Sequence, residues 1–540
     1  YNWVGFTARQ CGAVYRPDFM VTVDLPAPDD VFIQDVWAYS RTGAGETLAS
    51  LGAELMYRQR DVKGPYAPAW EPPPERRKET PPLAEPLLCA PSKAVYLHCI
   101  TGTGLDWPEA ARYFQRRLAA GKRCEPRYRD AVICKAAFAG KDAPIFSFVQ
   151  AEDALRRVAN ITDGLKQVCY FAMWQHRGGD NGWPDLSVVH PAVGDKATLR
   201  RIIAEAGRYN AVISFHNNFD EFDYENENFD GDYVGRDFAG RLWHTGRWGM
   251  AQLFKISVPA YRRELERVVE QIVKEYGIRE TLHLDTYSGG PYLHDFHPAH
   301  PYNATEYTAA KVALLDWIKA TYDIDVTSEN LTDPFVGHIG HVWALFDWDK
   351  VWDGEEQVPF AEFIYHGAIS WNSSSGASEQ AILDSLIKGG GLGYEPPQYF
   401  DWTAVVDGLY LAHQPYLALR DRRWKDYRRT GTVRRVEYEG RETYVEVDDE
   451  KKTYLVVIDG VVLAENFRTV FPGRLPGSYL AFSRTDTELD WPAPAGWREG
   501  PVPAVVLTEA GPGLRIPARI ERGRLRLALK AHQPVRLGPQ

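Results

Sequence analysis

Apolar and polar positions in the middle of the chain follow a repeating strand–helix rhythm. Four runs have the apolar character of buried strands: 168–174, 211–218, 281–287 and 324–329. Between them apolar residues recur at helical spacing, most clearly in the stripe from Tyr261 to Tyr276, which stops at Gly277. The segment Glu362–Gly367, expected as a strand, and the glycine-rich turn at 389–393 continue the series. Such repeated units predict a parallel sheet closed into a (β/α)8 TIM-type barrel.

The chain on either side of this region is rich in short β-type runs. The first part has such runs at 19–23, 31–38 and 94–100, and a charged, proline-rich stretch at 67–86 separates them. Asp106, followed by Trp-Pro, has the form of a helix N-cap and marks the change to helix. After about Thr430 strands and turn residues alternate to the end. We therefore expect three domains: an N-terminal β-domain (1–105), the barrel with its entry helices (106–425), and a C-terminal antiparallel β-domain (426–540), both flanking domains being of sandwich type.

Two carboxylates stand at the ends of consecutive predicted strands. Side chains alternate between the faces of a strand, so in 281–285 the two leucines face outward and Asp285 is the last inward residue. The same logic sends Glu329 inward at the end of the next strand. Reactive groups of such barrels lie where strands end, and glycosidic bond cleavage uses a pair of carboxyl groups. We expect Asp285, flanked by the donors Tyr287 and Ser288, to act as nucleophile and Glu329 as acid and base.

Polar and aromatic side chains gather at the ends of the other strands as well. Aromatic faces stack on the C–H surfaces of sugars, while imidazole and amide groups bind hydroxyls, so this gathering indicates a site for a hydroxyl-rich ligand. The alternative for each aromatic residue is that it fills the core. The residues predicted to bind substrate are Trp174, His176, His216, Asn217, Asn218, Tyr287, Tyr365, His366, Trp371 and Tyr394.

Composition and net charge disfavour some classes of binding partner. The chain has 540 residues with a formal net charge of −11, which disfavours nucleic acid and anionic membrane because both demand dense positive charge. No apolar run is long enough to cross a bilayer. The 17 tryptophans and 29 tyrosines agree with a carbohydrate partner. We expect a carbohydrate substrate, no nucleic acid, no membrane span and no cofactor.

A histidine-rich segment after Asp285 offers a different chemistry. His294, His297 and His300 recur at three-residue spacing, and imidazole suits zinc or iron. Prolines within the run preclude a regular helix that would present the three on one face. We therefore expect a loop that contacts substrate and no catalytic metal, with a histidine-dependent metallohydrolase as the alternative.

Signatures of other enzyme classes are missing from the sequence. There is no glycine fingerprint for a dinucleotide, which weighs against a doubly wound open sheet as the alternative to the barrel. The serines at 373–375 do not form the elbow of a serine hydrolase, and the turn at 389–393 lacks the Lys-Ser/Thr of a phosphate-binding loop.

The strand ends LHLDTYSGG and SEN, with HNN upstream and β-domains on both sides, resemble the endo-α-N-acetylgalactosaminidase family and related exo-acting α-N-acetylgalactosaminidases. The resemblance covers about residues 167–418. It implies a retaining glycoside hydrolase with Asp285 as nucleophile and Glu329 as acid/base. The chain lacks appended modules, so we expect an exo-acting enzyme that removes an α-linked galactose-type or N-acetylgalactosamine residue. The alternative is a non-catalytic carbohydrate-binding protein on the same scaffold.

Overall fold

A computed structural model of the chain provides the fold. It describes residues 2–5, 12–24, 33–43, 46–55, 58–59, 78, 81–82, 87–88, 96–140, 143–248, 251–289, 294–345, 358–394 and 401–538. Apart from residues 78, 81 and 82, the proline-rich stretch expected at 67–86 lies outside these ranges.

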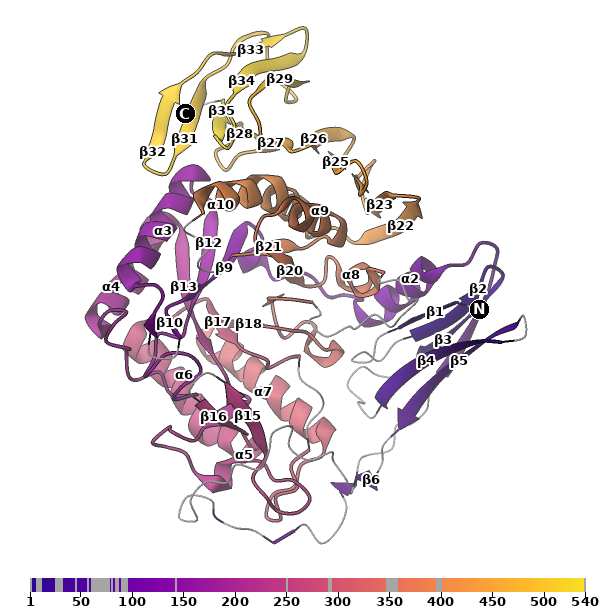
Figure 1. Ribbon diagram of the computed structural model, residues 1–540, viewed down its shortest axis with the longest axis vertical. Helices are drawn as coiled ribbons and strands as arrows, with labels where there is room; N and C mark the ends of the chain where they lie inside the picture. Colours follow the sequence, from indigo (N-terminus) through magenta and orange to yellow (C-terminus); the bar gives the residue numbers. More distant parts are fainter. Residues whose placement is uncertain are drawn as a thin grey trace.

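Eight parallel strands form a barrel in the centre of the molecule (Figure 1). Neighbouring strands pair in chain order, and the last and first meet at a bridge between Tyr394 and Cys134. The Lys135 N–H donates to the Tyr394 carbonyl at 2.9 Å across this seam, so the sheet closes and the predicted barrel is confirmed. The strands are β9 (Ala131–Ala137), β12 (Lys166–Ala172), β13 (Ala211–Asn217), β17 (Thr281–Leu284), β18 (Asp325–Ser328), β19 (His341–Val342), β20 (Ser370–Ser375) and β21 (Gly391–Gly393).

Helices surround the barrel where the apolar stripes predicted them. The Asp106 side chain accepts the Trp107 N–H at the start of α2, and Asp195 accepts the Thr198 N–H at the start of α4. Gly277, with φ +74°, ends the long helical segment α5 to η5. The helices are α2 (Trp107–Leu118), α3 (Phe148–Ile161), α4 (Lys196–Glu205), α5 (Val258–Ala260), η4 (Tyr261–Leu265), α6 (Glu266–Gln271), η5 (Ile272–Tyr276), α7 (Ala304–Tyr322), α8 (Phe360–Tyr365), α9 (Glu379–Lys388), α10 (Trp402–Gly408), η8 (Leu409–His413) and α11 (Gln414–Leu419).

The strand expected at Glu362–Gly367 is wrong, because that segment belongs to helix α8 and its exit. Phe360 and Phe363 lie on one helical face and pack edge-on against Trp107 of α2, with ring centroids 6.3 and 6.1 Å away. The barrel strand follows as β20. The sequence analysis also named neither β9 nor β19, and the two residues of β19 are too few for a strand period.

Short elements on the loops complete the barrel region. A small antiparallel sheet beyond β13 has the order β14, β16, β15, and its strand β14 begins at Glu221. The pairs and single-turn helices of this region are β10 (Ala139–Gly140), β11 (Ala143–Pro144), β14 (Glu221–Asp223), β15 (His244–Trp248), β16 (Ala251–Lys255), η1 (Pro126–Tyr128), η2 (Ala206–Tyr209), η3 (Gly231–Tyr233) and η6 (Asp333–Phe335).

Antiparallel sheets lie on both sides of the barrel in the expected order, and the boundaries at 105 and 425 stay a prediction. The N-terminal strands, close to α2 in Figure 1, form a sheet of order β1-β2-β3-β8 and two further pairs. They are β1 (Asn2–Gly5), β2 (Gly12–Arg16), β3 (Phe19–Asp24), β4 (Ile33–Gly43), β5 (Glu46–Leu55), β6 (Arg58–Gln59), β7 (Leu87–Leu88) and β8 (Tyr96–Thr101).

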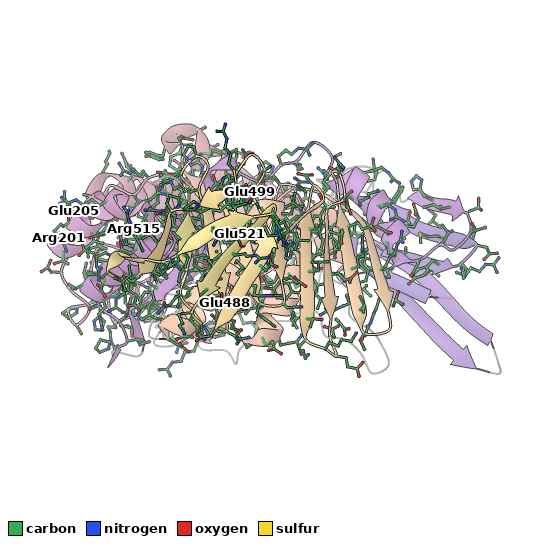
Figure 2. The ribbon with its side chains drawn as sticks, turned by 90° about the horizontal axis from the view of Figure 1, so that it is seen from above. Arg201, Glu205, Glu488, Glu499, Arg515 and Glu521 are labelled. Carbon is green, nitrogen blue, oxygen red and sulfur yellow. The ribbon has the colours of Figure 1, made fainter. Side chains whose placement is uncertain are left out.

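The C-terminal part forms a ten-stranded and a four-stranded antiparallel sheet. In β29, buried Leu489 and Trp491 alternate with exposed residues such as Glu488. Figure 2 labels Glu488 and also Glu521, which lies in the same four-stranded sheet. The large sheet contains β22 (Trp424–Thr430), β23 (Val433–Tyr438), β24 (Tyr444–Asp448), β25 (Thr453–Ile458), β26 (Val461–Glu465), β27 (Arg468–Pro472), β28 (Tyr479–Ser483), β35 (Val535–Leu537), β31 (Ala504–Thr508) and β32 (Gly511–Arg515), and the small one β29 (Thr487–Pro492), β34 (Arg524–Leu529), β33 (Ala518–Glu521) and β30 (Gly500–Pro501).

Side chains join the C-terminal sheet to the barrel at several points. The Tyr410 ring of η8 stacks on Phe482 of β28 at 4.8 Å between ring centroids. Asp407 of α10 lies 2.6 Å from the Nδ1 of His532, and Asp163, just after α3, is 2.6 Å from the Arg536 guanidinium. The sheet therefore contacts helical segments from both ends of the barrel sequence.

Candidate active site

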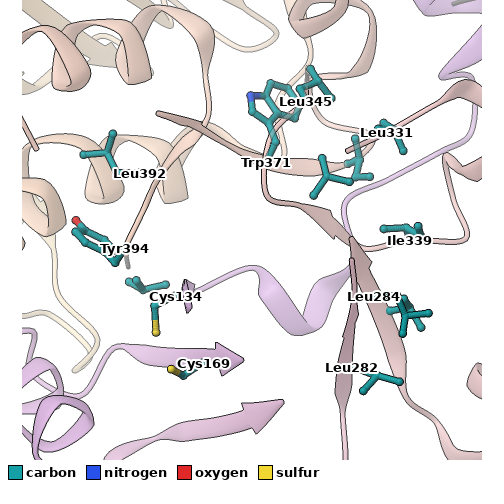
Figure 3. Close-up of a cluster of buried hydrophobic side chains, with 14 of the residues drawn as sticks. Cys134, Cys169, Leu282, Leu284, Leu331, Ile339, Leu345, Trp371, Leu392 and Tyr394 are labelled. Atoms are coloured by element: carbon teal, nitrogen blue, oxygen red, sulfur yellow. The ribbon is translucent and has the colours of Figure 1, made fainter. Parts of the chain in front are cut away.

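The interior of the barrel is built from the inward side chains of its strands. Leu282 and Leu284 of β17 belong to the hydrophobic core outside the barrel, and Figure 3 labels both there. The intervening His283 faces inward, where its Nδ1 lies 2.8 Å from the Thr327 hydroxyl of β18. The strand alternation thus has the predicted phase, and Asp285 and Glu329 follow on the same inner face, one step beyond each strand.

The two carboxyl groups interact directly. A side-chain hydrogen bond joins Glu329 to Asp285, and it lowers the pKa of Asp285 while raising that of Glu329. Burial and the neighbouring Asp285 charge together raise the pKa of Glu329 to about 8. Burial also raises the pKa of Asp285, but the hydrogen bond opposes this. The same hydrogen bond thus opposes the effect of burial on the pKa of Asp285 and adds to it on that of Glu329, so Glu329 is the stronger proton holder of the pair.

Two basic side chains border the pair. The Nε2 of His216, at the end of β13, lies 3.6 Å from the Asp285 Oδ1. Lys135 stands on β9, where it pairs in register with Tyr170 of β12. Its positive charge opposes the effect of burial and lowers the pKa of both Asp285 and Glu329. Lys135 thus favours an ionised nucleophile in a site that burial makes unfavourable for charge.

Stacked rings support these groups from below. Tyr170 stacks on His283 with 4.0 Å between ring centroids and an interplanar angle of 2°, and His216 also stacks on His283, with 5.1 Å between ring centroids. Burial lowers the pKa of His283 well below its usual value, so the ring is neutral. The column fixes the orientation of His216 beside Asp285.

Two further carboxyl groups belong to the same neighbourhood. Burial, followed by the charge of Asp285, raises the pKa of Asp180 to about 8. Glu221, at the start of β14, raises the pKa of Asp285 through its charge. Asp180, Glu221 and Lys135 were not predicted from the sequence as site residues. A signal existed only for Lys135, because it is a charged residue within the apolar strand AVICKAA.

The loop after β17 is tightly constrained next to Asp285. Thr286 adopts φ +52°, a left-handed conformation that is costly for a β-branched residue. A Cβ atom added to Gly289 would lie 2.2 Å from the Cβ of Asn330, so only glycine permits this approach to the loop after β18. The predicted donors Tyr287 and Ser288 point elsewhere: their hydroxyls donate to the carbonyls of Lys311 and Asn330. Ser288 thus ties this loop to the loop after β18, and Tyr287 ties it to helix α7.

Of the residues predicted to bind substrate, the structure brings His216 to the carboxyl pair. Asn217 donates to the Pro184 carbonyl at 3.0 Å, and its own carbonyl accepts the Asp285 N–H at 2.7 Å. Asn218 holds Glu221, as its side-chain amide donates to the Glu221 Oε2 at 2.9 Å. These two asparagines position the site rather than face it.

The predicted residues Trp174 and His176 have other partners. Trp174 is completely buried, with Phe215 at 4.6 Å and Tyr276 at 5.5 Å between ring centroids. The Nε2 of His176 lies 3.0 Å from the Asp185 carboxylate. Trp174 leaves no face for a sugar because its ring lies between the strands and the long helical segment.

The remaining five predicted residues are also buried in the core around the barrel. Both ring nitrogens of His366 face backbone carbonyls, of Arg422 and Gly389. The Tyr365 hydroxyl donates to Asp333, and Tyr287 contacts the Lys311 carbonyl as described. Figure 3 shows Trp371 and Tyr394 within a cluster of buried apolar side chains. For these aromatic residues the core-filling alternative describes the observed surroundings.

The buried position of Trp174 predicts that its replacement lowers the stability of the fold and leaves substrate binding almost unchanged. Replacing Trp174 with Ala should destabilise the folded chain by about 3–5 kcal/mol, because it removes a large buried ring. The KM of the remaining folded enzyme should stay within about twofold of the wild-type value. Thermal unfolding followed by circular dichroism, with kinetics well below the transition, measures both. A large increase in KM at unchanged stability would contradict this assignment.

Among the described residues, one group of possible metal ligands converges: His216, His283 and Asp285 offer ligand atoms within 4.8 Å of one another. Imidazole and carboxylate are donors that divalent transition metals accept. His294, His297 and His300 do not form such a group. His297 and His300 instead stack at 3.6 Å, and the Asp295 between the first two accepts the Arg236 N–H at 2.9 Å. His294, His297 and His300 lie in a folded loop. They do not form the metal-ligand set that the metallohydrolase alternative requires.

Comparisons with known proteins agree with this architecture. Residues 128–300 match the family model described as endo-alpha-N-acetylgalactosaminidase, a range that contains Asp285 and stops before Glu329. The alpha-N-acetylgalactosaminidase NagBb from Bifidobacterium bifidum, in its ligand-free structure, superposes with a TM-score of 0.63 at 14% identity, over 83% of this chain and 74% of that one. Its GalNAc complex gives 0.61 at 14% identity, over 84% and 74%. None of the curated proteins compared matches the chain.

The resemblance to the endo-α-N-acetylgalactosaminidase family and its relatives is thereby confirmed, and the NagBb superposition shows the shared barrel fold. The family match supports glycosidase activity on a carbohydrate substrate. The helices of the described ranges include none with the length and apolar character required to span a bilayer.

Proposed function

We propose that the chain is a retaining α-glycosidase in which Asp285 is the nucleophile and Glu329 the acid and base. The observation that carries this proposal is the hydrogen bond between the two carboxyl groups at the ends of β17 and β18. In it Glu329, whose pKa is raised to about 8, donates and Asp285 accepts, which matches the roles of acid and nucleophile in the first step.

The contact between the two groups favours retention over inversion. An inverting enzyme holds a water molecule between its carboxyl groups, which needs a separation of about 6.5–9.5 Å, whereas a retaining enzyme needs about 5–5.5 Å. Carboxyl groups that hydrogen-bond directly leave no room for that water.

The chemistry then follows in two steps. An Asp285 oxygen attacks the anomeric carbon while Glu329 transfers its proton to the leaving oxygen, which gives a glycosyl ester on Asp285 and a free alcohol. In the second step Glu329, now ionised, takes a proton from water, and the water oxygen replaces Asp285 at the anomeric carbon. Esterification removes the Asp285 charge that raises the pKa of Glu329, so Glu329 becomes a suitable base when that role begins.

We assign the substrate as an α-linked galactose-type or N-acetylgalactosamine residue at the end of a glycan or glycoconjugate. The support is the family match over residues 128–300 and the fold shared with NagBb, an alpha-N-acetylgalactosaminidase solved with GalNAc.

A panel of 4-nitrophenyl glycosides tests the proposal. The α-galactoside or the N-acetyl-α-galactosaminide should be the best substrate, and the β-anomers should not be cleaved. Proton NMR during the first minutes should show the α-anomer of the released sugar, because two displacements restore the configuration. Initial release of the β-anomer would contradict retention. Binding of the sugars without any turnover would favour the carbohydrate-binding alternative.

A further inference from the structure

Glu221 is a carboxylate that the two proposed steps do not use. It opens β14, and its side chain is 12% exposed. Asn218 fixes it twice: the amide donates to Glu221 Oε2 at 2.9 Å, and the amide oxygen accepts the Glu221 N–H at 3.0 Å. The other oxygen, Oε1, lies 3.9 Å from the Lys255 ammonium, which is beyond hydrogen-bond distance. The carboxylate is therefore held in one orientation by one of its oxygens.

A buried ionic network supports this orientation. Glu221 pairs with Lys255 across β14 and β16, and Lys255 also lies 3.5 Å from the Asp220 carboxylate. Asp220 is in turn 2.6 Å from the ammonium of Lys311, which enters from α7 and sits 4.4 Å from the centre of the Tyr287 ring. Two lysines thus face two adjacent carboxylates. The network connects the loop after β13, the small sheet, α7 and the loop that follows Asp285.

The position of Glu221 disfavours the ionised nucleophile. Its charge raises the pKa of Asp285, and like charges in a buried site are costly. It acts on Asp180 in the same direction, and Asn218, which holds it, directly follows Asn217, whose carbonyl accepts the Asp285 N–H at 2.7 Å. The other titratable side chains that act on these carboxyl groups come from several elements: Lys135 of β9, Asp180 after β12, His216 of β13, Asp285 after β17 and Glu329 after β18.

We infer that Glu221 binds the sugar that is attacked by Asp285, through hydrogen bonds from its hydroxyl groups to Oε1. A carboxylate accepts hydrogen bonds and cannot donate them, so it selects ligand groups that are donors. The same charge stabilises the positive charge that develops on the ring in the transition state. This inference rests on the proposed function. It adds a specificity-determining residue, and it excludes sugars that present a carboxylate or sulfate to Glu221.

A substrate-deletion cycle tests the contact. The wild type and the isosteric variant Glu221→Gln are compared on 4-nitrophenyl α-galactoside and its 2-, 3-, 4- and 6-deoxy analogues. For the wild type, kcat/KM should fall about 10–100-fold on loss of the contacted hydroxyl, because a hydrogen bond to a charged group is lost. In Glu221→Gln the same deletion should cost less than about threefold. Equal losses in both enzymes for every deoxy analogue would overturn the inference.

Two controls separate this contact from a structural effect and from the proposed function. Glu227→Gln changes an exposed glutamate six residues further along the same loop and should give wild-type losses with every analogue. If the wild type cleaves no glycoside, the proposed function fails. The cycle is then measured as Kd for methyl α-galactoside and its deoxy analogues by calorimetry. Coupling between Glu221 and one hydroxyl in those values would support the inference, and its absence would overturn it.

Discussion

Replacing Asp285 with Asn should lower kcat on the best aryl α-glycoside by a factor on the order of 10⁴ or more, the scale expected when a nucleophile is lost. Asparagine keeps the size of the side chain and its capacity to accept a hydrogen bond, but its amide cannot form the glycosyl ester. Burial and the loop geometry around Thr286 and Gly289 should be unchanged, so the fold should survive. Initial-rate kinetics and a circular dichroism spectrum measure the two effects.

Mass spectrometry provides a second measurement on the same variant. An activated 2-deoxy-2-fluoro α-glycoside should add one sugar mass to the wild type, on the peptide that contains Asp285, and nothing to Asp285→Asn. The matched control is Asp323→Asn, because Asp323 is exposed, has a left-handed backbone that asparagine tolerates, and lies just before β18. It should retain full activity. Labelling of a different carboxylate, or an active Asp285→Asn enzyme, would exclude the assigned nucleophile.

The variant Glu329→Ala should lose about 10²–10⁴-fold in kcat on substrates with poor leaving groups. Glycosides with a dinitrophenyl leaving group need little protonation and should still form the glycosyl ester, which then accumulates. Sodium azide needs no general base and fits the space left by the side chain, so it should accelerate turnover and yield the α-glycosyl azide. Glu270→Ala, an exposed glutamate on α6, is the control and should show no azide effect.

The pH dependence of the wild type follows from the same residue. Glu329 must be protonated in the first step, and its pKa is raised to about 8. The value of kcat/KM should therefore stay level up to slightly alkaline pH and fall as the pH rises through about 8. At the acid end it should fall when Asp285 takes up a proton, above the usual aspartate range because burial raises its pKa. Loss of the alkaline limb in Glu329→Ala is expected, and an unchanged limb in that variant would assign the acid to another group.

The sequence was sufficient to predict the barrel and the inner face of its strands. Period-2 alternation in 281–285 and 325–329 depends only on local geometry, and the contacts of His283 with Thr327 have the expected phase. The helices were predictable for the same reason, from apolar stripes and caps such as Asp195. The catalytic roles of Asp285 and Glu329 remain proposals that the experiments above address.

The predicted substrate-binding residues show where local patterns stop being informative. The position of a residue at a strand end indicates its height along the barrel axis. It does not indicate whether the side chain points toward that axis or toward the surrounding helices, because the chain changes direction in the loop. Trp174 and Trp371 lie at such ends and are buried in the outer core. Lys135 contributes from β9, a strand whose neighbour across the seam is more than 250 residues away, at Tyr394. The local pattern marks Lys135 as a charged residue in an apolar strand, but the groups that it meets are brought together only when the barrel closes.

The contacts of the C-terminal sheet bear on the order in which the chain can fold during synthesis. The barrel seam joins Cys134 to Tyr394, and the helical segments on its two sides are held by Phe482, His532 and Arg536. A ribosome releases these residues after the barrel strands, since synthesis runs from the N-terminus. Before then the pairing of the first and last strands lacks the contacts from the C-terminal sheet, and the seam can reopen. The carboxylate pair and Lys135, which stand on opposite parts of the closed ring, thus reach a stable spacing only after the C-terminal sheet has been synthesised.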